Sequence, residues 1–361
     1  MRLWMHGCGP QPTEGARHLK ELGFEAVVGG EETVQAALEQ GLQAYLCSGA
    51  YRGPAFTGEE WLAEDMWGRR QKWFSSTCPT RKEVRAYNLE VVRKMAQTPG
   101  IQGILIDGAR FASPSSGESS DAFYTCFCPH CMEKAEKMGF DAKEMRMAAA
   151  MLYDFLHGKP LDLMPFYAGL REWMEFRRAA TTEHLLDFVQ AVKEVNPDLK
   201  AGVYIFAPAL SDLVGQHYRD LRGKMDIIAP MLYRCYPQES GPACLNVELA
   251  DMLTMLEGTA NLTPQQRIYA LNALTGHELV GYEDPDELRK GLDVSILRRE
   301  AQRAKRMAAD QEVIPIIELD DPKLESAILQ TAAGGADGVN FFLYEEALVE
   351  RHRDLWRRLG G

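Results

Sequence analysis

Eight short hydrophobic runs recur along the chain, and each ends in small or polar residues before a helix-like segment begins. The runs lie at residues 3–7, 24–30, 42–48, 101–107, 199–207, 225–233, 313–319 and 338–344. Between them, apolar residues at helical spacing predict helices over 13–22, 31–40, 81–96, 173–196, 295–310 and 322–333. Strands that alternate with helices pair in parallel through right-handed crossovers. The pattern therefore predicts an α/β fold with a parallel sheet.

The number of strand–helix units favours a closed (β/α)8 barrel, the TIM barrel, over an open sheet. An open dinucleotide-binding sheet would carry a GxGxxG motif after its first strand, whereas this chain has Gly7-Cys8-Gly9-Pro10 there. Such barrels run from about 200 to over 400 residues as one unit. We therefore expect residues 1–361 to form a single barrel domain.

Two connections are too long to be simple crossovers. The first, about 112–171, follows the fourth strand and contains a cluster of cysteines. The second, about 234–312, follows the sixth strand and holds a further candidate strand at 267–271. Long loops within a compact domain are usually functional or are insertions. We expect both to be insertions into the barrel.

The charge balance restricts the partners. The chain has 361 residues with 40 Lys+Arg against 52 Asp+Glu, a net charge of −12. This acidic balance argues against nucleic acid and anionic membranes as partners. No signal-peptide pattern and no stretch of about 18 apolar residues occurs, so we expect a cytoplasmic protein. Whether copies of the chain form a homo-oligomer is left open.

Three cysteines lie within six residues, in Cys126-Phe-Cys128-Pro-His-Cys131. In a reducing compartment such a cluster indicates metal ligands, and zinc takes four of them in a tetrahedron. The fourth ligand is either Cys78, which follows the third strand, or His130, which is poorly placed beside Cys131. A site with four thiolates has no open position, which predicts a structural zinc. The alternative is that these thiols pack as small hydrophobic groups.

The other four cysteines are isolated in the sequence and are expected to pack as small hydrophobic side chains. They are Cys8, Cys47, Cys235 and Cys244.

A cysteine after the third strand, a helix into the fourth strand and CxCxxC beyond it together resemble the zinc site of glycoside hydrolase family 42 β-galactosidases. The resemblance covers about residues 74–139. It implies Cys78, Cys126, Cys128 and Cys131 as the four zinc ligands. Three shorter segments, 103–111, 226–233 and 335–344, resemble glycosidase-like barrels more broadly.

Catalytic residues of a (β/α)8 barrel stand at the C-terminal ends of the strands. The polar residues expected there are His6, Tyr51, Asp107, Arg110, Tyr204, Tyr233, Arg234, Glu318, Asp320, Asp321, Asn340 and Tyr344. Cleavage of a glycosidic bond needs two carboxyl groups on either side of the bond. The only acids that follow apolar strand cores are Asp107, after the fourth strand, and the group beginning at Glu318, after the seventh. These two residues are therefore the predicted catalytic pair.

The resemblance to family 42 implies that Glu318 is the nucleophile and Asp107 the acid/base. Those enzymes carry Asn-Glu at the end of the fourth strand, where this chain has Asp107-Gly108. The reverse assignment therefore stays open, with Asp107 as nucleophile and Glu318 or Asp320 as proton donor. We expect Arg110 to pair with Asp107 or a neighbouring acid and to lower the pKa of that acid.

The sequence thus predicts a glycoside hydrolase that acts on a small carbohydrate and carries a structural zinc. The expected substrate-binding residues are His6, Arg110, Tyr204, Tyr233, Arg234, Asp320 and Tyr344. Trp61, Trp67 and Trp73 are expected either to stack on sugar rings or to pack in the interior. One alternative is a non-catalytic carbohydrate-binding barrel. Another is a metal-assisted hydrolase or lyase with a divalent ion held by His6, Asp107 and Glu318.

Overall fold

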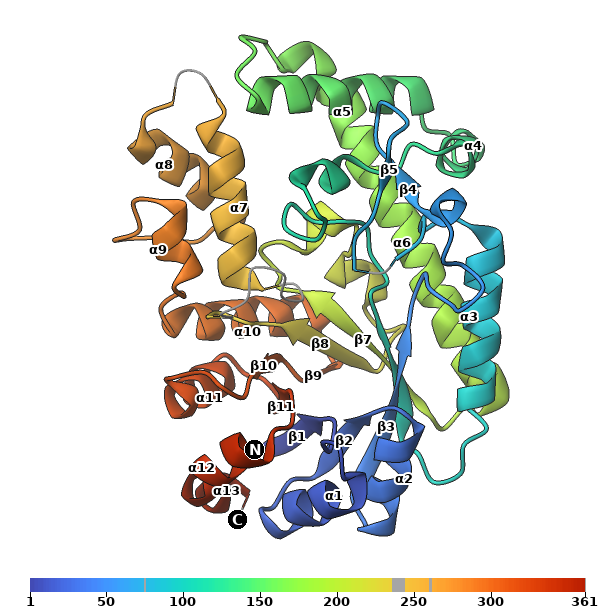
Figure 1. The fold of residues 1–361 in the computed structure, drawn as a ribbon, viewed down its shortest axis with the longest axis vertical. Coiled ribbons are helices and arrows are strands. Elements are labelled where there is room, and N and C mark those ends of the chain that lie inside the picture. The colour runs from blue at the N-terminus through green and yellow to red at the C-terminus, as the bar shows by residue number, and fades with distance from the viewer. Residues whose placement is uncertain (75, 236–243, 260–261, 361) are drawn as a thin grey trace.

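The computed structural model describes residues 1–74, 76–235, 244–259 and 262–360, and its centre is a closed parallel barrel (Figure 1). The strands are β1 Arg2–His6, β2 Ala26–Gly29, β3 Gln43–Gly49, β6 Gly103–Asp107, β7 Lys200–Phe206, β8 Ile227–Met231, β9 Glu312–Val313, β10 Ile316–Glu318 and β11 Gly338–Phe342. Each pairs in parallel with its neighbours, and pairing of Ile316 with Met231 closes the ring. The predicted TIM barrel is confirmed.

The seventh position of the barrel is shared by the two short strands β9 and β10. Proline has no N–H to donate to a strand ladder, and Pro315 lies between the two strands. Pairing continues on either side, because the Ile314 N–H donates to Ile228 and the Pro315 carbonyl accepts from Asn340, both at 2.9 Å. The strand therefore still delivers Glu318 to the C-terminal end of the barrel.

All six predicted helices are present on the outside of the barrel. They are α1 Pro12–Glu21, α2 Glu31–Glu39, α3 Lys82–Met95, α6 Tyr167–Val195, α10 Ser295–Ala308 and α11 Leu324–Ala333. Two more helices, α12 Glu346–Arg351 and α13 Arg353–Gly360, follow the last strand. In α1 the buried residues Ala16 and Leu19 are three apart, which places them on one face of the helix.

A second hydrophobic core lies beyond the barrel end, in the upper part of Figure 1. It is built by α4 Pro129–Lys137 and α5 Ala142–Leu156 of the first insertion, next to the short hairpin of β4 Ala63–Glu64 and β5 Arg70–Gln71. Single 3₁₀ turns occur at Glu59–Trp61, Ser120–Tyr124, Met164–Phe166, Ser211–Val214 and Tyr218–Leu221.

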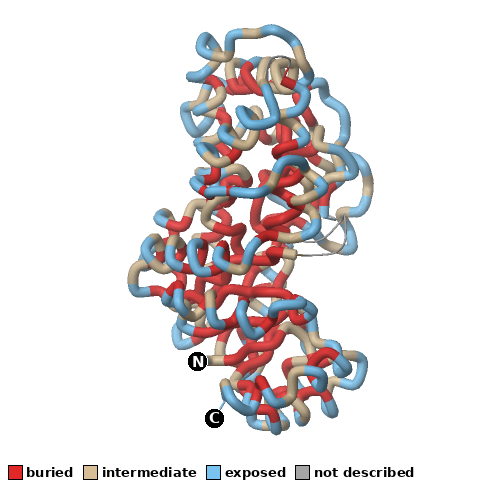
Figure 2. Tube along the Cα trace, turned by 90° about the vertical axis from the view of Figure 1, so that its left-hand side faces the viewer, coloured by how far each residue is buried: buried red, intermediate tan, exposed pale blue. Residues whose placement is uncertain are grey.

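Helix α6 connects the two cores. Its 29 residues span about 43 Å at 1.5 Å per residue. Trp173 and Phe176 near its start are buried in the second core, whereas Phe188 and Val192 near its end are buried against the barrel. Buried positions accordingly run from the barrel into the upper part of the molecule (Figure 2). We propose on this ground that residues 1–361 form one domain.

The regular elements of the second insertion that lie before α10 are all helices in its described part. It contains α7 Leu245–Glu257, α8 Pro264–Thr275 and α9 Pro285–Arg289, while residues 236–243 and 260–261 lie outside the described residues. The strand predicted at 267–271 is wrong, because this segment is the middle of α8. Thr263 and Gln266 form a reciprocal capping box and Pro264 occupies the first turn, so the local sequence starts a helix.

No helix within the described residues is long and apolar enough to cross a membrane.

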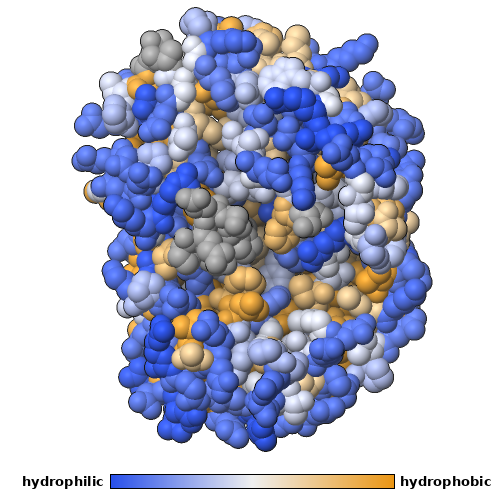
Figure 3. All heavy atoms as spheres, viewed as in Figure 1, coloured by the Kyte–Doolittle hydropathy of each residue, from blue (hydrophilic) through white to orange (hydrophobic). Residues whose placement is uncertain are grey.

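On the face shown in Figure 3, hydrophilic side chains dominate the periphery and hydrophobic ones gather near the middle.

Candidate active site and metal centre

Asp107 is the last residue of β6 and pairs with Gly49 of β3. Its side chain is partly buried, and burial raises the pKa of its carboxyl, while the positive charges of Arg52 and then Arg110 offset part of that increase. Arg110 thus lowers the pKa of Asp107 as expected, but the net pKa is raised because the loss of solvation outweighs both arginines.

Arg110 also makes no ion pair with Asp107 within 4.0 Å. Its Nη1 donates instead to the Phe111 carbonyl at 3.1 Å and to Ser116 Oγ at 2.9 Å. The guanidinium lies over the rings of Phe206, at 4.6 Å from the centroid, and Trp73, at 5.0 Å. The loop after β6 thus holds Arg110 beside Asp107 without a direct contact.

Glu318 is the last residue of β10 and is 6% exposed. The Cys235 thiol donates to its Oε2 at 3.0 Å, and its Oε1 is buried without a partner among the described residues. Burial raises the pKa of Glu318 to about 7, although the hydrogen bond from Cys235 works against the increase. A carboxyl group in this environment is substantially protonated near neutral pH.

A hydrogen-bonded group of side chains from three strands, which we call the floor of the barrel mouth, is formed by His6, Tyr204 and Asn340. The Tyr204 hydroxyl lies 3.1 Å from His6 Nδ1 and accepts from Asn340 Nδ2 at 3.0 Å. Burial lowers the pKa of His6 to about 4, so its imidazole is neutral at pH 7. The residues come from β1, β7 and β11, which the barrel closure brings together.

The pKa of the Tyr233 phenol is influenced by both acids. Burial raises the pKa of its phenol well above the ordinary value, and the charges of Asp107 and Glu318 both add to the increase. Its ring also lies 5.5 Å from that of Phe342, which in turn lies 5.6 Å from the His6 ring. Asp107 and Glu318 therefore act electrostatically on one side chain at the mouth.

Three predicted substrate-binding residues have partners elsewhere. The Arg234 guanidinium is buried and forms an ion pair with Asp321. Asp320 is exposed and pairs with Arg351 at 3.1 Å. The Tyr344 hydroxyl lies 3.3 Å from His18 Nδ1 and lines a cavity of about 580 Å³ between α1 and α12. The structure does not bring these three side chains to the floor that Tyr204 and His6 form.

The predicted aromatic platforms differ in accessibility. Trp73 is 1% exposed, so it packs in the interior, and Trp67 is exposed but has its ring 4.5 Å from that of Tyr153. An exposed aromatic ring that was not predicted, that of Phe74, lies next to Gly108, the residue after Asp107. Phe74 could not be predicted from the sequence because it lies in a turn, where its backbone has a φ of +44°, and no strand or helix pattern indicates where its side chain points.

The four predicted zinc ligands come together in the second core. Cys78, Cys126, Cys128 and Cys131 are buried, and their sulfur atoms all lie within 4.8 Å of one another. Thiolates about 2.3 Å from a tetrahedral zinc stand about 3.8 Å apart, so the cluster can hold a metal ion such as zinc. Among the described residues no other group of three or more His, Cys, Asp or Glu side chains is this close. His6, Asp107 and Glu318 do not form the metal site of the metal-assisted alternative.

Neighbouring groups donate hydrogen bonds to the sulfur atoms. The Glu64 N–H donates to Cys126 Sγ at 3.3 Å, and Thr80 Oγ1 lies 3.1 Å from Cys131 Sγ. His130, the alternative ligand, bonds to Arg81 at 2.6 Å instead. The fourth ligand position therefore belongs to Cys78.

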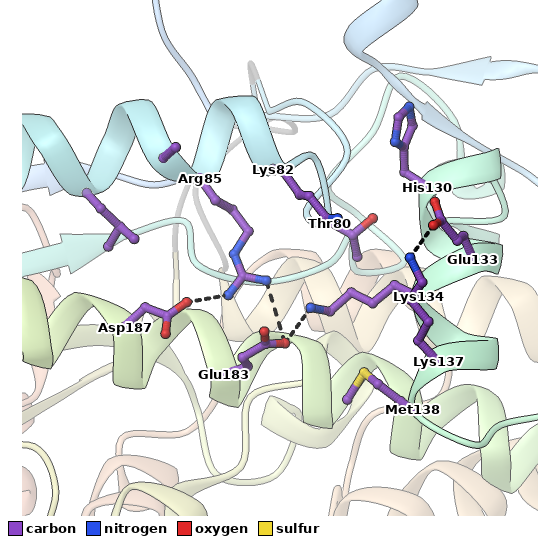
Figure 4. Close-up of a pocket in the computed structure, with 12 residues that line it drawn as sticks. Thr80, Lys82, Arg85, His130, Glu133, Lys134, Lys137, Met138, Glu183 and Asp187 are labelled. Atoms are coloured by element: carbon purple, nitrogen blue, oxygen red, sulfur yellow. Dashed lines mark hydrogen bonds and ion pairs between the residues drawn. The ribbon is translucent and has the colours of Figure 1, made fainter.

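A cavity of about 590 Å³ lies beside the cysteine cluster (Figure 4). Its charged groups neutralise one another, because Arg85 pairs with Asp187 at 2.8 Å and with Glu183 at 3.7 Å, and Lys134 also pairs with Glu183. This cavity is separate from the floor of the barrel mouth.

The TIM-barrel architecture is similar to that of several solved glycoside hydrolases. A β-galactosidase from the Antarctic haloarchaeon Halorubrum lacusprofundi matches 96% of this chain with a TM-score of 0.63 and 16% identity. A catalytic mutant of Gan42B, a family 42 β-galactosidase from G. stearothermophilus, matches 99% with a TM-score of 0.56 and 13% identity. The glycoside hydrolase domain of PgaB (BpsB) from Bordetella bronchiseptica matches 99% of this chain and 97% of its own, with a TM-score of 0.58 and 13% identity.

The chain spans only 53% and 56% of the two β-galactosidases. At these identities the likeness shows the fold, and activity has to be argued from the site. No protein-family profile and no curated protein sequence matches the chain.

Proposed function

We propose that the chain is a glycoside hydrolase that uses Asp107 and Glu318 as its two carboxyl groups. The observation that carries the proposal is that both acids are the last residues of strands of one closed parallel barrel, so both stand at its C-terminal end. Two carboxyl groups at the C-terminal end of a barrel are the chemical minimum for cleaving a glycosidic bond. The fold of the structural neighbours supports a carbohydrate substrate.

The electrostatics favour Glu318 as the proton donor. Its pKa of about 7 leaves a proton available at neutral pH, and donation of that proton to the glycosidic oxygen would accompany cleavage of the bond to the anomeric carbon. Burial raises the pKa of Asp107 as well, but Arg52 and Arg110 both offset part of that increase. We therefore assign Asp107 the ionised role, in which it would attack the anomeric carbon or take a proton from water. This is the reverse of the assignment that the family 42 resemblance implies.

The floor residues would bind the sugar. Neutral His6 and the Tyr204 and Asn340 side chains offer donors and acceptors that match hydroxyl groups. Tyr233, whose phenol both acids influence electrostatically, would lie near the sugar at the cleavage point.

We further propose that the four cysteines hold a structural zinc, because four thiolates complete its coordination and leave no position for a substrate. Stable thiolate ligation requires a reducing compartment, which supports a cytoplasmic location.

The experiment is a panel of nitrophenyl glycosides, assayed beside calorimetric titration with the corresponding free sugars. Turnover that is lost in Asp107→Asn and lowered in Glu318→Gln, with the thermal unfolding temperature kept, supports the hydrolase. Binding of a sugar without any turnover would overturn the proposal and favour the non-catalytic carbohydrate-binding barrel.

A further inference from the structure

Two arginines flank an exposed aromatic ring beside Asp107. The Arg52 guanidinium carbon lies 6.0 Å from the Phe74 ring centroid, and that of Arg110 lies 5.6 Å from the same centroid. Phe74 is 37% exposed and contacts the position of Gly108, directly after Asp107. Arg52 folds over Gly49, which is the strand partner of Asp107. The ring and both cations therefore belong to the same edge of the barrel mouth.

Neither arginine has an ion-pair partner within 4.0 Å among the described residues. Arg110 is only 3% exposed, and burial lowers the pKa of its guanidinium, while the charges of Glu248 and Asp107 offset part of that decrease without a direct ion pair. Its Nε and Nη2 make no hydrogen bond to the described residues, yet neither is among the fully buried nitrogens. The buried Arg177 differs, because its unpartnered Nε is fully enclosed. Arg110 thus keeps one edge of its guanidinium available to a ligand.

The opposite edge of Arg110 is fixed. Ser116 accepts from Nη1 and contacts Ser113, whose hydroxyl donates to Glu248 of α7. The Ser115 N–H donates to the other Glu248 oxygen at 3.3 Å. Glu248 is 1% exposed, so this chain of bonds ties the loop after β6 to the second insertion. It orients Arg110 before a ligand arrives and so reduces the entropic cost of binding.

We infer that the substrate is an acidic carbohydrate, whose anionic group binds at Arg52 and Arg110 while its sugar ring lies against the exposed part of Phe74. A guanidinium matches the two oxygens of a carboxylate, sulfate or phosphate in one plane. An aromatic face suits the apolar face of a sugar ring. The inference rests on the proposed function for the location of the reacting bond, but the binding step does not require hydrolysis.

The test is calorimetric titration with methyl glycosides of glucuronic and galacturonic acid, each compared with its neutral parent sugar. Sulfated and phosphorylated forms of the parent sugars are titrated as well. Their affinities show whether the site prefers a carboxylate, a sulfate ester or a phosphate ester. We expect at least one acidic ligand to bind tenfold or more tightly than its neutral parent. Equal affinities across the whole panel would refute the inference.

Three variants locate the binding. Arg52→Met and Arg110→Met should each weaken acidic-ligand binding at least tenfold and leave neutral-sugar binding within twofold. Arg52 is exposed, so its replacement tests the site without endangering the fold. Arg17→Met, on the exposed face of α1, is the matched control and should change nothing. Unchanged acidic-ligand binding in Arg52→Met would contradict the assignment.

The same measurements separate this inference from the hydrolase proposal. Hydrolysis of neutral and acidic glycosides at equal efficiency would refute the acidic preference and keep the hydrolase. Arginine-dependent binding of acidic sugars with no hydrolysis of any glycoside would refute the hydrolase proposal and keep the acidic preference.

Discussion

The Cys235 thiol donates a hydrogen bond of 3.0 Å to Glu318 Oε2, and this contact joins the loop after β8 to the end of β10. The carboxyl has little other solvation, since its Oε1 is buried without a partner among the described residues. A thiol is a weak donor, so it compensates only part of the cost of ionising a buried carboxyl group. The pKa of Glu318 therefore stays near 7.

Activity should fall as the pH rises through about 7, because Glu318 must be protonated to act as the acid. Cys235→Ala removes a bond that lowers the pKa of Glu318, so the alkaline limb should move to higher pH. The measurement is the pH profile of kcat/KM for both proteins, with Cys8→Ala as a control at an isolated buried thiol. A limb that stays in place in Cys235→Ala would exclude this role of the thiol.

Glu318 should also make stability depend on pH. Its pKa is raised on folding from the ordinary 4.5 to about 7, so the folded state binds more protons between these values and stability decreases as pH rises through them. The loss is on the order of 3 kcal/mol, from the shift multiplied by about 1.4 kcal/mol per pKa unit. Urea unfolding at pH 4.5 and pH 8 should show this decrease in the wild type relative to Glu318→Gln. Parallel pH dependence in the two proteins would argue against the raised pKa.

Tyr204→Phe should destabilise the protein by about 1–3 kcal/mol, because it leaves His6 and Asn340 without the hydroxyl that they share. Urea unfolding measures the loss. Tyr269→Phe is the control, since Tyr269 is 76% exposed and should change stability by less than about 0.5 kcal/mol. Equal stability of Tyr204→Phe and the wild type would show that the floor does not depend on this hydroxyl.

Protein prepared without added metal should contain about one zinc per chain by elemental analysis. Cys126→Ser should lose the metal and unfold at a markedly lower temperature, because Cys126 lies in the second core and structural zinc contributes directly to folding. His130→Ala should keep the metal, because His130 bonds to Arg81 and not to the sulfur cluster. Loss of zinc from His130→Ala but not from Cys78→Ser would reverse the ligand assignment.

The barrel could be predicted from the sequence because its strands are continuous apolar runs between amphipathic helices, a pattern that local residues set. The first insertion was recognised only as a long loop. Its helices α4 and α5 gain their stability from packing on Trp173 and Phe176 of α6, a relationship that no local pattern reveals. The segment 267–271 was misread because its apolar residues outweighed the capping box that begins with Thr263.

The cysteine cluster was predictable because the chemistry of zinc constrains ligand type and spacing. The electrostatics of the mouth were not, since they depend on burial and on residues distant in sequence. Arg52, Phe74, Cys235 and Glu248 were missed for this reason, although Cys235 follows β8 closely and Arg52 adjoins Tyr51. The net pKa of Asp107 could not be predicted for the same reason, because the sequence shows Arg110 nearby and does not show the loss of solvation.

The most direct test of the catalytic pair compares leaving groups. An aryl glycoside with a dinitrophenolate leaving group needs little protonation, whereas an alkyl glycoside depends on the acid. If Glu318 is the donor, Glu318→Gln should lower kcat/KM for the alkyl glycoside at least a hundredfold and for the dinitrophenyl glycoside less than tenfold. Asp107→Asn should lower both at least a hundredfold. Equal losses for both substrates in Glu318→Gln, or full activity in Asp107→Asn, would contradict the account.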